Sequence, residues 1–399
     1  MDAIKFKGKY LTTEKYEKLS EKEKEHFHKQ LNKLNFDFIL NSILNNNQGR
    51  ISPINVLKVK DIEEKKNEYY KKGIEALKEG KIAMVSLAGG MGTRLGSNSP
   101  KGTYNIGITK DLYIFECQIS ELLSVVKECG NWIYLFIMTS EKNHDETVKF
   151  LKDKNYFGYN EKYIIFFNQE MSPTTDFEGN ILMENNYTIS TSPNGNGGWY
   201  SSMIKEGLMD IINENGIEYF NVYSIDNVLQ KMADPYFIGA TLLNNVDCGA
   251  KVIKKAYPDE KLGVICLEDN HPSITEYYEL TDELRNSKDE NGNYMYDYGV
   301  ILNYLFKKSS LDKIASIGFP VHKVAKKIPY TNENGNLIEP SEPNGYKYET
   351  LILDMIKLLD SCLPYEVIRE KEFAPIKNLH GVDSVDTARE LLVKNGVKL

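Results

Sequence analysis

The sequence is poor in the residues that usually carry metal, redox or nucleophilic chemistry. Only 6 of its 399 residues are histidine and only 5 are cysteine. No two cysteines stand in a Cys-x-x-Cys spacing, and no histidines stand at metal-ligand spacing, which argues against a zinc site and a disulfide framework. We expect free, buried thiols in a reducing compartment at all five cysteine positions: Cys117, Cys129, Cys248, Cys266 and Cys362.

Long apolar runs and an excess of basic residues are also missing. No run approaches the roughly 20 apolar residues that span a bilayer, and residues 1–6 form no apolar signal segment. The formal net charge of -8 argues against a general nucleic-acid binder. It still allows a nucleotide site, because local cations can focus a field within an acidic protein. We therefore expect a cytoplasmic protein with no membrane or nucleic-acid partner.

The length and composition are those of a globular protein with a large core. Hydrophobic residues make up 41% of the chain and charged residues 27%. Residues 14–44 and 61–77 have helical periodicity, and the Asn-rich stretch 45–49 between them is predicted to be a loop. We predict three consecutive parts: an N-terminal helical segment at 1–80, a core domain at 81–324 and a small C-terminal domain at 325–399.

Short apolar runs alternate with helical patterns in the predicted core domain. This alternation predicts a Rossmann-like, doubly wound α/β sheet of mixed type, with its site at the carboxyl ends of the strands. We predict buried strands at 82–87, 132–138, 163–167, 219–224, 247–253 and 263–267, an exposed hairpin at 254–260, and helices at 112–126, 141–151, 348–359 and 384–393.

A glycine-rich loop with two cations follows the first of these strands. The segment Ser86-Leu87-Ala88-Gly89-Gly90-Met91-Gly92-Thr93-Arg94-Leu95-Gly96 is followed by Pro100-Lys101-Gly102. Glycines allow the backbone to approach a ligand closely, and Arg94 and Lys101 favour a phosphate-rich one. The spacing matches neither a Walker A loop nor the dinucleotide fingerprint. A plain structural turn is the alternative interpretation of the glycines alone.

Two later segments fit the same edge of the predicted sheet. Asp226 follows the strand at 219–224, where a nucleotidyltransferase would hold Mg²⁺. Capping of the segment that begins at Asn227 is an equal alternative for this carboxylate. The stretch 194–198 contains three glycines and predicts a tight loop that can contact a ligand, with a plain hairpin turn as its alternative.

The glycine loop and several later strings resemble the eukaryotic UDP-sugar pyrophosphorylases, most closely those that make UDP-N-acetylglucosamine. The resemblance runs from about Leu11 to Asn378, and the strings occur in the family's order. Besides the loop they are Phe166-Phe167-Asn168-Gln169, Pro193-Asn194-Gly195-Asn196-Gly197-Gly198, Asp226-Asn227-Val228-Leu229, Ala233-Asp234-Pro235, Asp247-Cys248-Gly249-Ala250-Lys251-Val252, Glu276-Tyr277, Lys326-Lys327-Ile328-Pro329-Tyr330, and the run from Arg369 to Asn378.

The resemblance implies a cytoplasmic uridylyltransferase that converts UTP and N-acetylglucosamine-1-phosphate into UDP-N-acetylglucosamine and pyrophosphate with Mg²⁺ or Mn²⁺. It makes residues 81–324 the nucleotidyltransferase domain. By this resemblance Ala88, Gly89, Gly90, Gln169 and Gly195 bind the uridine, Asn196, Glu276 and Lys347 the sugar side, Arg94, Lys101 and Lys377 the phosphates, and Asp226 the metal. The predicted assembly is a monomer or a weak homodimer.

One segment departs from the family pattern. Asp297-Tyr298-Gly299-Val300 stands where the family has Asn-Ala-Gly-Asn in its sugar pocket. This replacement leaves a second enzyme open, a pyrophosphorylase for glucose-, galactose- or N-acetylgalactosamine-1-phosphate. A catalytically inactive UDP-sugar binder is the alternative from another class, although a mere binder would not need the full set of Arg94, Lys101, Asp226 and Lys377.

Overall fold

The structure, a computed structural model, describes residues 9–40, 42–43 and 49–399. The predicted loop at 45–49 therefore lies outside the described residues except for Gly49. The chain forms two compact units, each assembled from three separate stretches. Unit 1 contains residues 1–47, 169–198 and 318–354, and unit 2 contains residues 48–168, 199–317 and 355–399. The predicted boundaries at residues 80 and 324 do not coincide with these limits, because the chain passes between the two units repeatedly.

Unit 2 holds a sheet of ten strands, with seven in the order β12-β11-β13-β9-β3-β4-β5. Both faces of this sheet are covered by helices, as the predicted doubly wound mixed fold requires. Its strands are β2 (Ile51–Ser52), β3 (Ile82–Leu87), β4 (Leu135–Thr139), β5 (Ile164–Asn168), β9 (Tyr219–Ser224), β10 (Cys248–Lys254), β11 (Val264–Glu268), β12 (His271–Thr275), β13 (Tyr298–Lys307) and β18 (Cys362–Glu366).

The helices of unit 2 connect and cover these strands. They are α4 (Val59–Glu64), α5 (Lys66–Lys78), α6 (Ile114–Cys129), α7 (His144–Asp153), α8 (Trp199–Lys205), α9 (Met209–Glu214), α10 (Pro235–Leu243), α11 (Asp282–Asn286), α12 (Lys308–Ile317), α14 (Arg369–Glu372) and α15 (Val385–Lys394). The short helix α13 (Ile352–Lys357) begins in unit 1 and ends in unit 2.

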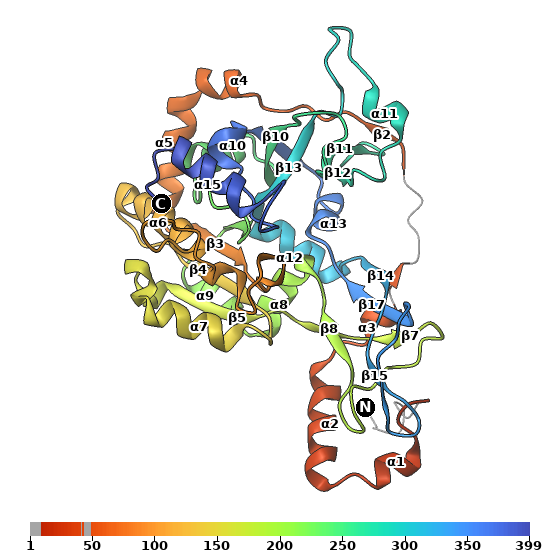
Figure 1. The fold of residues 1–399 in the computed structure, drawn as a ribbon. Coiled ribbons are helices and arrows are strands. Elements are labelled where there is room, and N and C mark those ends of the chain that lie inside the picture. The colour runs from red at the N-terminus through yellow and green to blue at the C-terminus, as the bar shows by residue number, and fades with distance from the viewer. Residues whose placement is uncertain (1–8, 41, 44–48) are drawn as a thin grey trace. The chain divides into compact units, whose positions relative to one another are not determined.

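The central strands are parallel, as their continuous apolar sequences predict. Strands β9, β3, β4 and β5 pair in parallel in that order, and Figure 1 shows β3, β4 and β5 side by side. Ile82 and Met84 pack on one face with residues of α6. On the other face Phe220 lies against the ring of Trp199 from α8. Burial on both faces explains why the sequences of β3, β4 and β9 are mostly apolar.

Two glycines let the helices α5 and α10 approach each other closely. A Cβ atom on Gly73 would lie 1.8 Å from the carbonyl oxygen of Pro235, and one on Gly239 would lie 1.8 Å from that of Tyr69. Neither distance is sterically possible, so both positions require glycine. The contact fixes the start of α10, where Asp234 caps the helix.

Unit 1 is built from short strands and N-terminal helices. Its four-stranded sheet has the order β1-β14-β17-β7, and its core includes Phe27, Leu182 and Ile328. Its elements are α1 (Thr13–Glu17), α2 (Glu21–Lys33), α3 (Asp37–Leu40), β1 (Ser42–Ile43), β6 (Met171–Pro173), β7 (Thr175–Asp176), β8 (Thr191–Pro193), β14 (Val321–Lys326), β15 (Tyr330–Thr331), β16 (Leu337–Ile338) and β17 (Gly345–Glu349). The predicted helix at 14–44 is thus divided, because Ser20 forms a capping box with Glu23 and starts α2 anew.

Two local predictions are wrong. The segment 254–260 is not a hairpin between neighbouring strands, since β10 pairs with β13 and β18 while β11 pairs with β12, β13 and β2. The predicted helix at 348–359 begins only at Ile352. Residues 345–349 form β17, which is stabilised by pairing with β14 and β7. In both places distant strand partners override the local sequence pattern.

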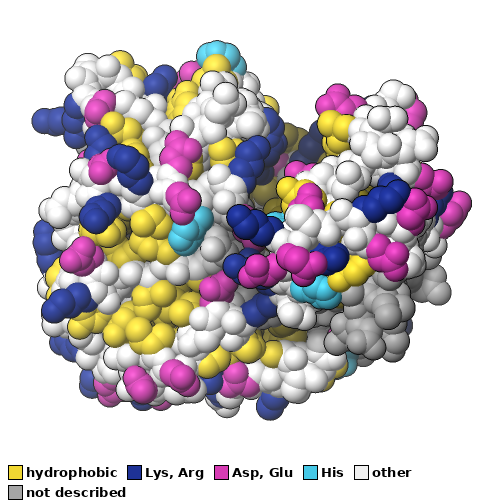
Figure 2. Space-filling model, turned by 90° about the horizontal axis from the view of Figure 1, so that it is seen from below, with side chains coloured by type: hydrophobic (Ala, Val, Ile, Leu, Met, Phe, Trp, Pro, Cys, Tyr) yellow, Lys and Arg dark blue, Asp and Glu magenta, His cyan; other side chains and the backbone are white. Residues whose placement is uncertain are grey.

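In the described parts of the chain, no helix combines the length and the apolar character needed to cross a bilayer. All five cysteines are free thiols, of which Cys129, Cys248 and Cys266 are buried. On the face drawn in Figure 2, cationic and anionic side chains are interspersed over the described residues, without the single basic stripe that is typical of nucleic-acid binders.

Candidate active site

The predicted phosphate residues of unit 2 gather where the strand order of the sheet reverses. The chain runs from β3 outward to β4 and β5 and then returns to β9 on the other side of β3. Ligands of such sheets bind at this switch point, beyond the carboxyl ends of the strands. The glycine loop follows β3 and Asp226 follows β9. The two meet there, because Nζ of Lys101 lies 2.8 Å from Oδ1 of Asp226.

The glycine loop is held in one shape by its own backbone. The amide nitrogen of Gly92 donates to the carbonyl of Ser99 at 2.9 Å, and that of Lys101 donates to the carbonyl of Gly90 at 3.1 Å. Gly90 is exposed and a Cβ atom there would meet nothing within 4 Å. The chain itself thus leaves open space above Gly90, in line with a loop that a ligand approaches.

Asn143 fastens this loop to the rest of the sheet, a role that the sequence did not indicate. The residue is fully buried, and its Nδ2 donates to the carbonyl of Ala88 at 3.0 Å and to that of Gly90 at 3.3 Å. These contacts bracket Gly89, so all three glycine-loop residues predicted for the uridine lie in one braced segment. The position precedes α7 and has no sequence signal that links it to residues 50 positions earlier.

Arg94 stands in a short turn of the same loop with a free guanidinium group. It lies in the 3₁₀ turn Thr93–Leu95, which ends at Gly96 with a φ of 74°. The Arg94 side chain is exposed and makes no hydrogen bond or ion pair with the part of the chain that the structure describes. A free guanidinium can bind a phosphate group through two parallel hydrogen bonds.

Buried amides hold the turn that carries Asp226. Nε2 of Gln230 donates to the carbonyl of Ser224 at 2.7 Å. Gln118 is only 2% exposed, although it stands on the apolar face of α6 between Ile114 and Leu122. The position of this polar residue on the apolar face of a helix is the sequence signal that could have identified its role in holding the turn. Its Nε2 lies 3.1–3.3 Å from the carbonyl oxygens of Ser224, Ile225 and Asn227.

The C-terminal segment places Lys377 next to this turn. The amide of Ile376 donates to the carbonyl of Asp226 at 2.9 Å, and the amide of Ala374 donates to Oδ1 of Asn227 at the same distance. Nζ of Lys377 lies 3.0 Å from Oδ2 of Asp383. The structure therefore places Lys377 next to a residue that is bonded to the backbone of Asp226, about 150 residues away in sequence.

Glu276 directly follows β12, which is the strand at one edge of the main sheet. Burial and the neighbouring carboxylate of Glu279 raise the pKa of Glu276, while Lys377 acts to lower it. A Cβ atom built on Gly263 would lie 3.6 Å from Val300 and 4.0 Å from the carboxylate of Glu276. Val300, from the segment that departs from the family pattern, therefore lies on the same side as Glu276. Asp297 instead faces Lys254, with 3.4 Å between Oδ2 and Nζ.

The remaining predicted residues belong to unit 1. Nε2 of Gln169 donates to the carbonyl of Gly195 at 2.6 Å, so the structure joins these two candidates. Gly195 has a φ of 88°, and a Cβ atom there would lie 2.2 Å from the carbonyl oxygen of Thr350. Oδ1 of Asn196 accepts a hydrogen bond from the amide of Ile352 at 3.0 Å. Lys347 lies half-buried on β17, opposite Val324 of β14.

A buried triad of ionic side chains stabilises the C-terminal segment that leads to Lys377. Lys251 is fully buried, and its Nζ lies 3.0 Å from Asp234 and 2.6 Å from Glu372. Nδ2 of Asn227 donates to the carbonyl of Glu372 at 2.7 Å. The triad therefore joins β10, the start of α10 and the segment that leads to Lys377.

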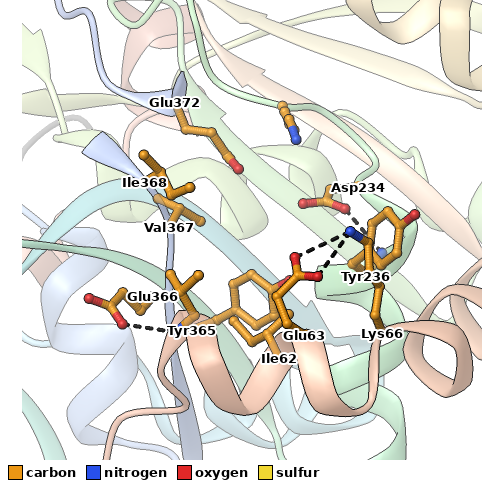
Figure 3. A pocket seen from close by; sticks show the side chains of 12 residues that line it. Ile62, Glu63, Lys66, Asp234, Tyr236, Tyr365, Glu366, Val367, Ile368 and Glu372 are labelled. Carbon is orange, nitrogen blue, oxygen red and sulfur yellow. Dashed lines mark hydrogen bonds and ion pairs between the residues drawn. The ribbon is translucent and has the colours of Figure 1, made fainter. Parts of the chain in front are cut away.

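A cavity of about 130 Å³ lies beside this triad. Asp234 and Glu372 line it, together with Tyr365 and the ion pair of Glu63 and Lys66, as Figure 3 shows. None of the residues predicted for substrate binding lines this cavity. We therefore assign the candidate site to the switch point of the sheet and not to this cavity.

The switch point fits a metal ion that is bound mainly by its substrate. Among residues 9–40, 42–43 and 49–399, no group of three His, Cys, Asp or Glu side chains could enclose an ion. Asp226 offers one carboxylate, which is 28% exposed and paired with Lys101. Mg²⁺ commonly takes one or two carboxylates and completes its shell with phosphate oxygens and water. The donor set is thus compatible with a nucleotide-borne Mg²⁺ and not with a protein cage.

Comparison with known proteins identifies the family of this chain. The model of the UTP–glucose-1-phosphate uridylyltransferase family matches residues 24–393. A UDP-N-acetylglucosamine pyrophosphorylase of Saccharomyces cerevisiae is 37% identical over 83% of this chain and 72% of its own length. UDP-N-acetylhexosamine pyrophosphorylase-like protein 1 of Mus musculus is 34% identical over 79% of this chain. This chain spans only 64% of that mouse relative.

A solved structure supports the same grouping. A protein of Entamoeba histolytica, provisionally named a UDP-N-acetylglucosamine pyrophosphorylase, superposes with a TM-score of 0.78 and 33% identity. The match covers 86% of this chain and 88% of that one. The glycine loop, Asp226 and Lys377 thus occur within a match that spans nearly the whole chain, and the chain belongs to the UTP–glucose-1-phosphate uridylyltransferase family.

Proposed function

We propose that this protein transfers a uridylyl group from UTP to N-acetylglucosamine-1-phosphate, releasing UDP-N-acetylglucosamine and pyrophosphate. The observation that carries the proposal is the meeting of the glycine loop and Asp226 at the switch point, with Lys101 paired to Asp226 at 2.8 Å. Relatives named for this activity are 37% identical in yeast and 34% identical in Arabidopsis thaliana.

The reaction needs positioning and charge neutralisation more than proton transfer. An oxygen of the sugar phosphate, already anionic at neutral pH, attacks the α-phosphorus of UTP. A new phosphorus–oxygen bond forms, the bond to the bridging oxygen of the β-phosphate breaks, and pyrophosphate leaves. Because the nucleophile carries no proton that must be removed, no general base is required. The main obstacle is the repulsion between two polyanions, which fixed cations relieve.

Each predicted site residue has a defined role in the proposed reaction. Ala88, Gly89 and Gly90 are assigned to the uridine, and the free guanidinium of Arg94 binds phosphate oxygens. Lys101 and Lys377 act as point charges near the reacting phosphates. Asp226 would hold Mg²⁺, which supplies further charge neutralisation when bound. Gln169 and Gly195 of unit 1 are assigned to the uridine, and Asn196, Lys347 and Glu276 to the sugar side.

The first experiment measures pyrophosphate release from UTP with Mg²⁺, using N-acetylglucosamine-1-phosphate and glucose-1-phosphate in parallel. Turnover with the N-acetyl sugar alone, lost in Arg94→Ala and after chelation with EDTA, supports the proposal. Absence of turnover with either sugar, despite measurable UDP-sugar binding, contradicts it and favours an inactive binder.

A second sugar specificity is favoured by one observation. Val300 replaces an amide of the family pattern and lies on the same side as Glu276. An aliphatic side chain cannot hydrogen-bond an acetamido group, so discrimination for that group would rest on other residues. Preference for glucose-, galactose- or N-acetylgalactosamine-1-phosphate in the same assay assigns the protein to this second enzyme.

The cellular compartment and the oligomeric state are proposed from fewer observations. Five free thiols support a reducing compartment such as the cytosol, which fractionation of cells tests. A monomer or a weak homodimer remains the prediction for the assembly, and sedimentation velocity over a range of concentrations tests it.

A further inference from the structure

Each of the two lysines proposed for the phosphates lies against an aspartate. Nζ of Lys101 is 2.8 Å from Asp226, and Nζ of Lys377 is 3.0 Å from Asp383. Asp226 already has a proposed role with the metal. Asp383 has none, and the sequence did not single it out.

Asp383 also holds the backbone of Lys377. The amide nitrogens of Lys377 and Asn378 both donate to the carbonyl oxygen of Asp383, at 2.6 and 3.0 Å. Nδ2 of Asn378 donates to the carbonyl of Val382 at 3.0 Å and closes the loop between them. Lys377 is therefore fixed by Asp383 at its backbone and at its ammonium group.

The backbone at Asp383 is unusual for a residue with a side chain. Its φ is 52°, in the left-handed region that favours glycine. The same loop uses glycine at its other left-handed position, Gly381, where φ is 87°. A side chain at a conformation that glycine adopts more easily suggests that the carboxylate itself is needed.

Helix α15 anchors this loop to the body of unit 2. Ser384, which directly follows Asp383, is fully buried and caps α15, with Oγ accepting from the amide of Thr387 at 3.2 Å. The amide of Val385 donates to the carbonyl of Asn378 at 3.0 Å. Asp383 is thus attached to a rigid element, so it can fix the position of a longer and more exposed side chain.

The side chain of Lys377 needs such support. It is 38% exposed, and Asp383 is its one ionic partner among the residues that the structure describes. A free lysine side chain loses rotamer entropy when it is fixed. Holding the ammonium in place beforehand removes part of that cost from the step in which the transition state forms.

We propose that Asp383 is the positioning residue for Lys377: it holds the ammonium group in the free enzyme and presents it to a substrate phosphate. This inference rests on the proposed uridylyl transfer. Asp383 touches no reacting atom and acts only through Lys377. When the phosphate binds, its oxygens replace the carboxylate as the partner of the ammonium group, and no covalent bond changes at either residue.

The test compares Asp383→Asn with a matched control, Asp386→Asn. Asparagine tolerates the left-handed backbone and keeps the size of the side chain, so the variant should fold. Asp386 lies three residues away and pairs with the exposed His380 at 2.6 Å. We expect kcat of Asp383→Asn to fall about tenfold, by analogy with other supporting residues of an active site. The melting temperature and the KM for UTP should change little, and Asp386→Asn should match the wild type in all three.

A double-mutant cycle separates positioning from general stability. In a Lys377→Ala background, which retains a residual rate, Asp383→Asn should cause no further loss, because it acts only through the missing lysine. A further tenfold loss in that background would overturn the inference. Full activity of the single variant Asp383→Asn would overturn it as well, while leaving the proposed function intact.

A readout without turnover distinguishes the two proposals. The rate at which an acylating reagent modifies Lys377 is measured by mass spectrometry. We expect faster modification in Asp383→Asn than in the wild type or in Asp386→Asn, because the freed ammonium loses its ionic partner. A wild type without turnover contradicts the proposed function. Unchanged labelling in Asp383→Asn contradicts the positioning role whether or not turnover is present.

Discussion

The ammonium group of Lys101 lies 2.8 Å from the carboxylate of Asp226, and the lysine side chain is only 8% exposed. The pair joins the loop after β3 to the turn after β9, the two central parallel strands of the sheet. It therefore does two things at once. It joins the two loops at the switch point, and it holds two of the charged groups that the proposed reaction uses.

This pair should contribute to stability as well as to activity. Lys101→Met and Asp226→Asn are each expected to abolish pyrophosphate release and to lower the free energy of unfolding by about 1–3 kcal/mol, since each leaves a charged partner unpaired. The measurement is urea unfolding of the two single variants and the double variant. The double variant should lose less than the sum of the singles. Additive losses would show that the two residues do not interact in solution.

Arg94 should be dispensable for folding and essential for rate. Its guanidinium is exposed and has no partner in the described chain, so Arg94→Ala removes no stabilising contact. We expect the melting temperature to stay constant and kcat/KM to fall on the order of 10²–10³. Arg94→Lys should recover only part of the rate, because an ammonium cannot form two parallel hydrogen bonds. The control is Arg50→Ala, an exposed arginine outside the loop, and equal losses in both variants would contradict this role.

The ionised Glu276 side chain should lower the stability of the folded protein and strengthen the binding of the sugar phosphate. Burial and Glu279 raise its pKa, so the folded protein holds this proton more tightly than the unfolded chain. Ionisation above the ordinary pKa therefore costs stability, and the cost is present at pH 7. Glu276→Gln removes it, and the melting temperature should stay equal or rise. The KM for the sugar phosphate should increase about tenfold, as for a lost charged hydrogen bond.

The matched control for this prediction is Glu279→Gln. Glu279 is exposed, and its carboxylate accepts a hydrogen bond from the amide of Glu276 at 3.0 Å. Its removal lowers the pKa of Glu276 but leaves that carboxylate in place. The sugar KM at pH 7 should therefore remain near the wild-type value. A similar KM increase in both glutamine variants would assign the effect to the loop and not to the carboxylate of Glu276.

The buried triad around Lys251 should depend on pH in a defined direction. Burial acts to raise the pKa of Asp234, but Lys251 lowers it below its ordinary value of 3.8. Its contribution to stability is thus complete above that value and is lost as the pH falls through the depressed pKa. Lys251→Met should lower the free energy of unfolding by about 3–5 kcal/mol at pH 7, since two carboxylates lose their buried partner.

The difference between wild type and Lys251→Met should shrink as the pH is lowered below about 4, because protonated carboxyl groups no longer need the ammonium. Thermal unfolding in steps from pH 7 to pH 3 measures it. The control is Lys72→Met, which breaks an exposed pair with Glu75 and should change the free energy of unfolding little at any pH. A constant difference across the pH range would mean that the loss comes from packing alone.

Much of the fold follows from local sequence because its central strands are buried on both faces. Ile82–Leu87 and Tyr219–Ser224 are mostly apolar, and both were predicted with their correct bounds. The doubly wound sheet of the family is confirmed for the same reason. Residues 348–349 were misassigned to a helix because the strand at 345–349 is stabilised by pairing with β14 and β7, which are separate segments of the sequence.

The candidate site also contains residues that the sequence predicts and residues that only the fold identifies. Gly90, Arg94, Lys101 and Asp226 follow directly after strands, so their meeting could be predicted from the topology of the sheet. Asn143 and Gln230 act through backbone carbonyls 55 and 6 residues away, and Asp383 acts through the ammonium group of Lys377, 6 residues away. No local pattern announces such a partner, and only the folded chain identifies these residues.

The three-part construction of each unit has a consequence for anyone who wishes to study them separately. The chain changes unit after residues 47, 168, 198, 317 and 354. No contiguous stretch of the sequence therefore contains one unit whole without part of the other, and a single protease cut at any one of these points leaves the two units connected through the other four crossings. Expression of either unit alone would require its three stretches to be rejoined by designed linkers.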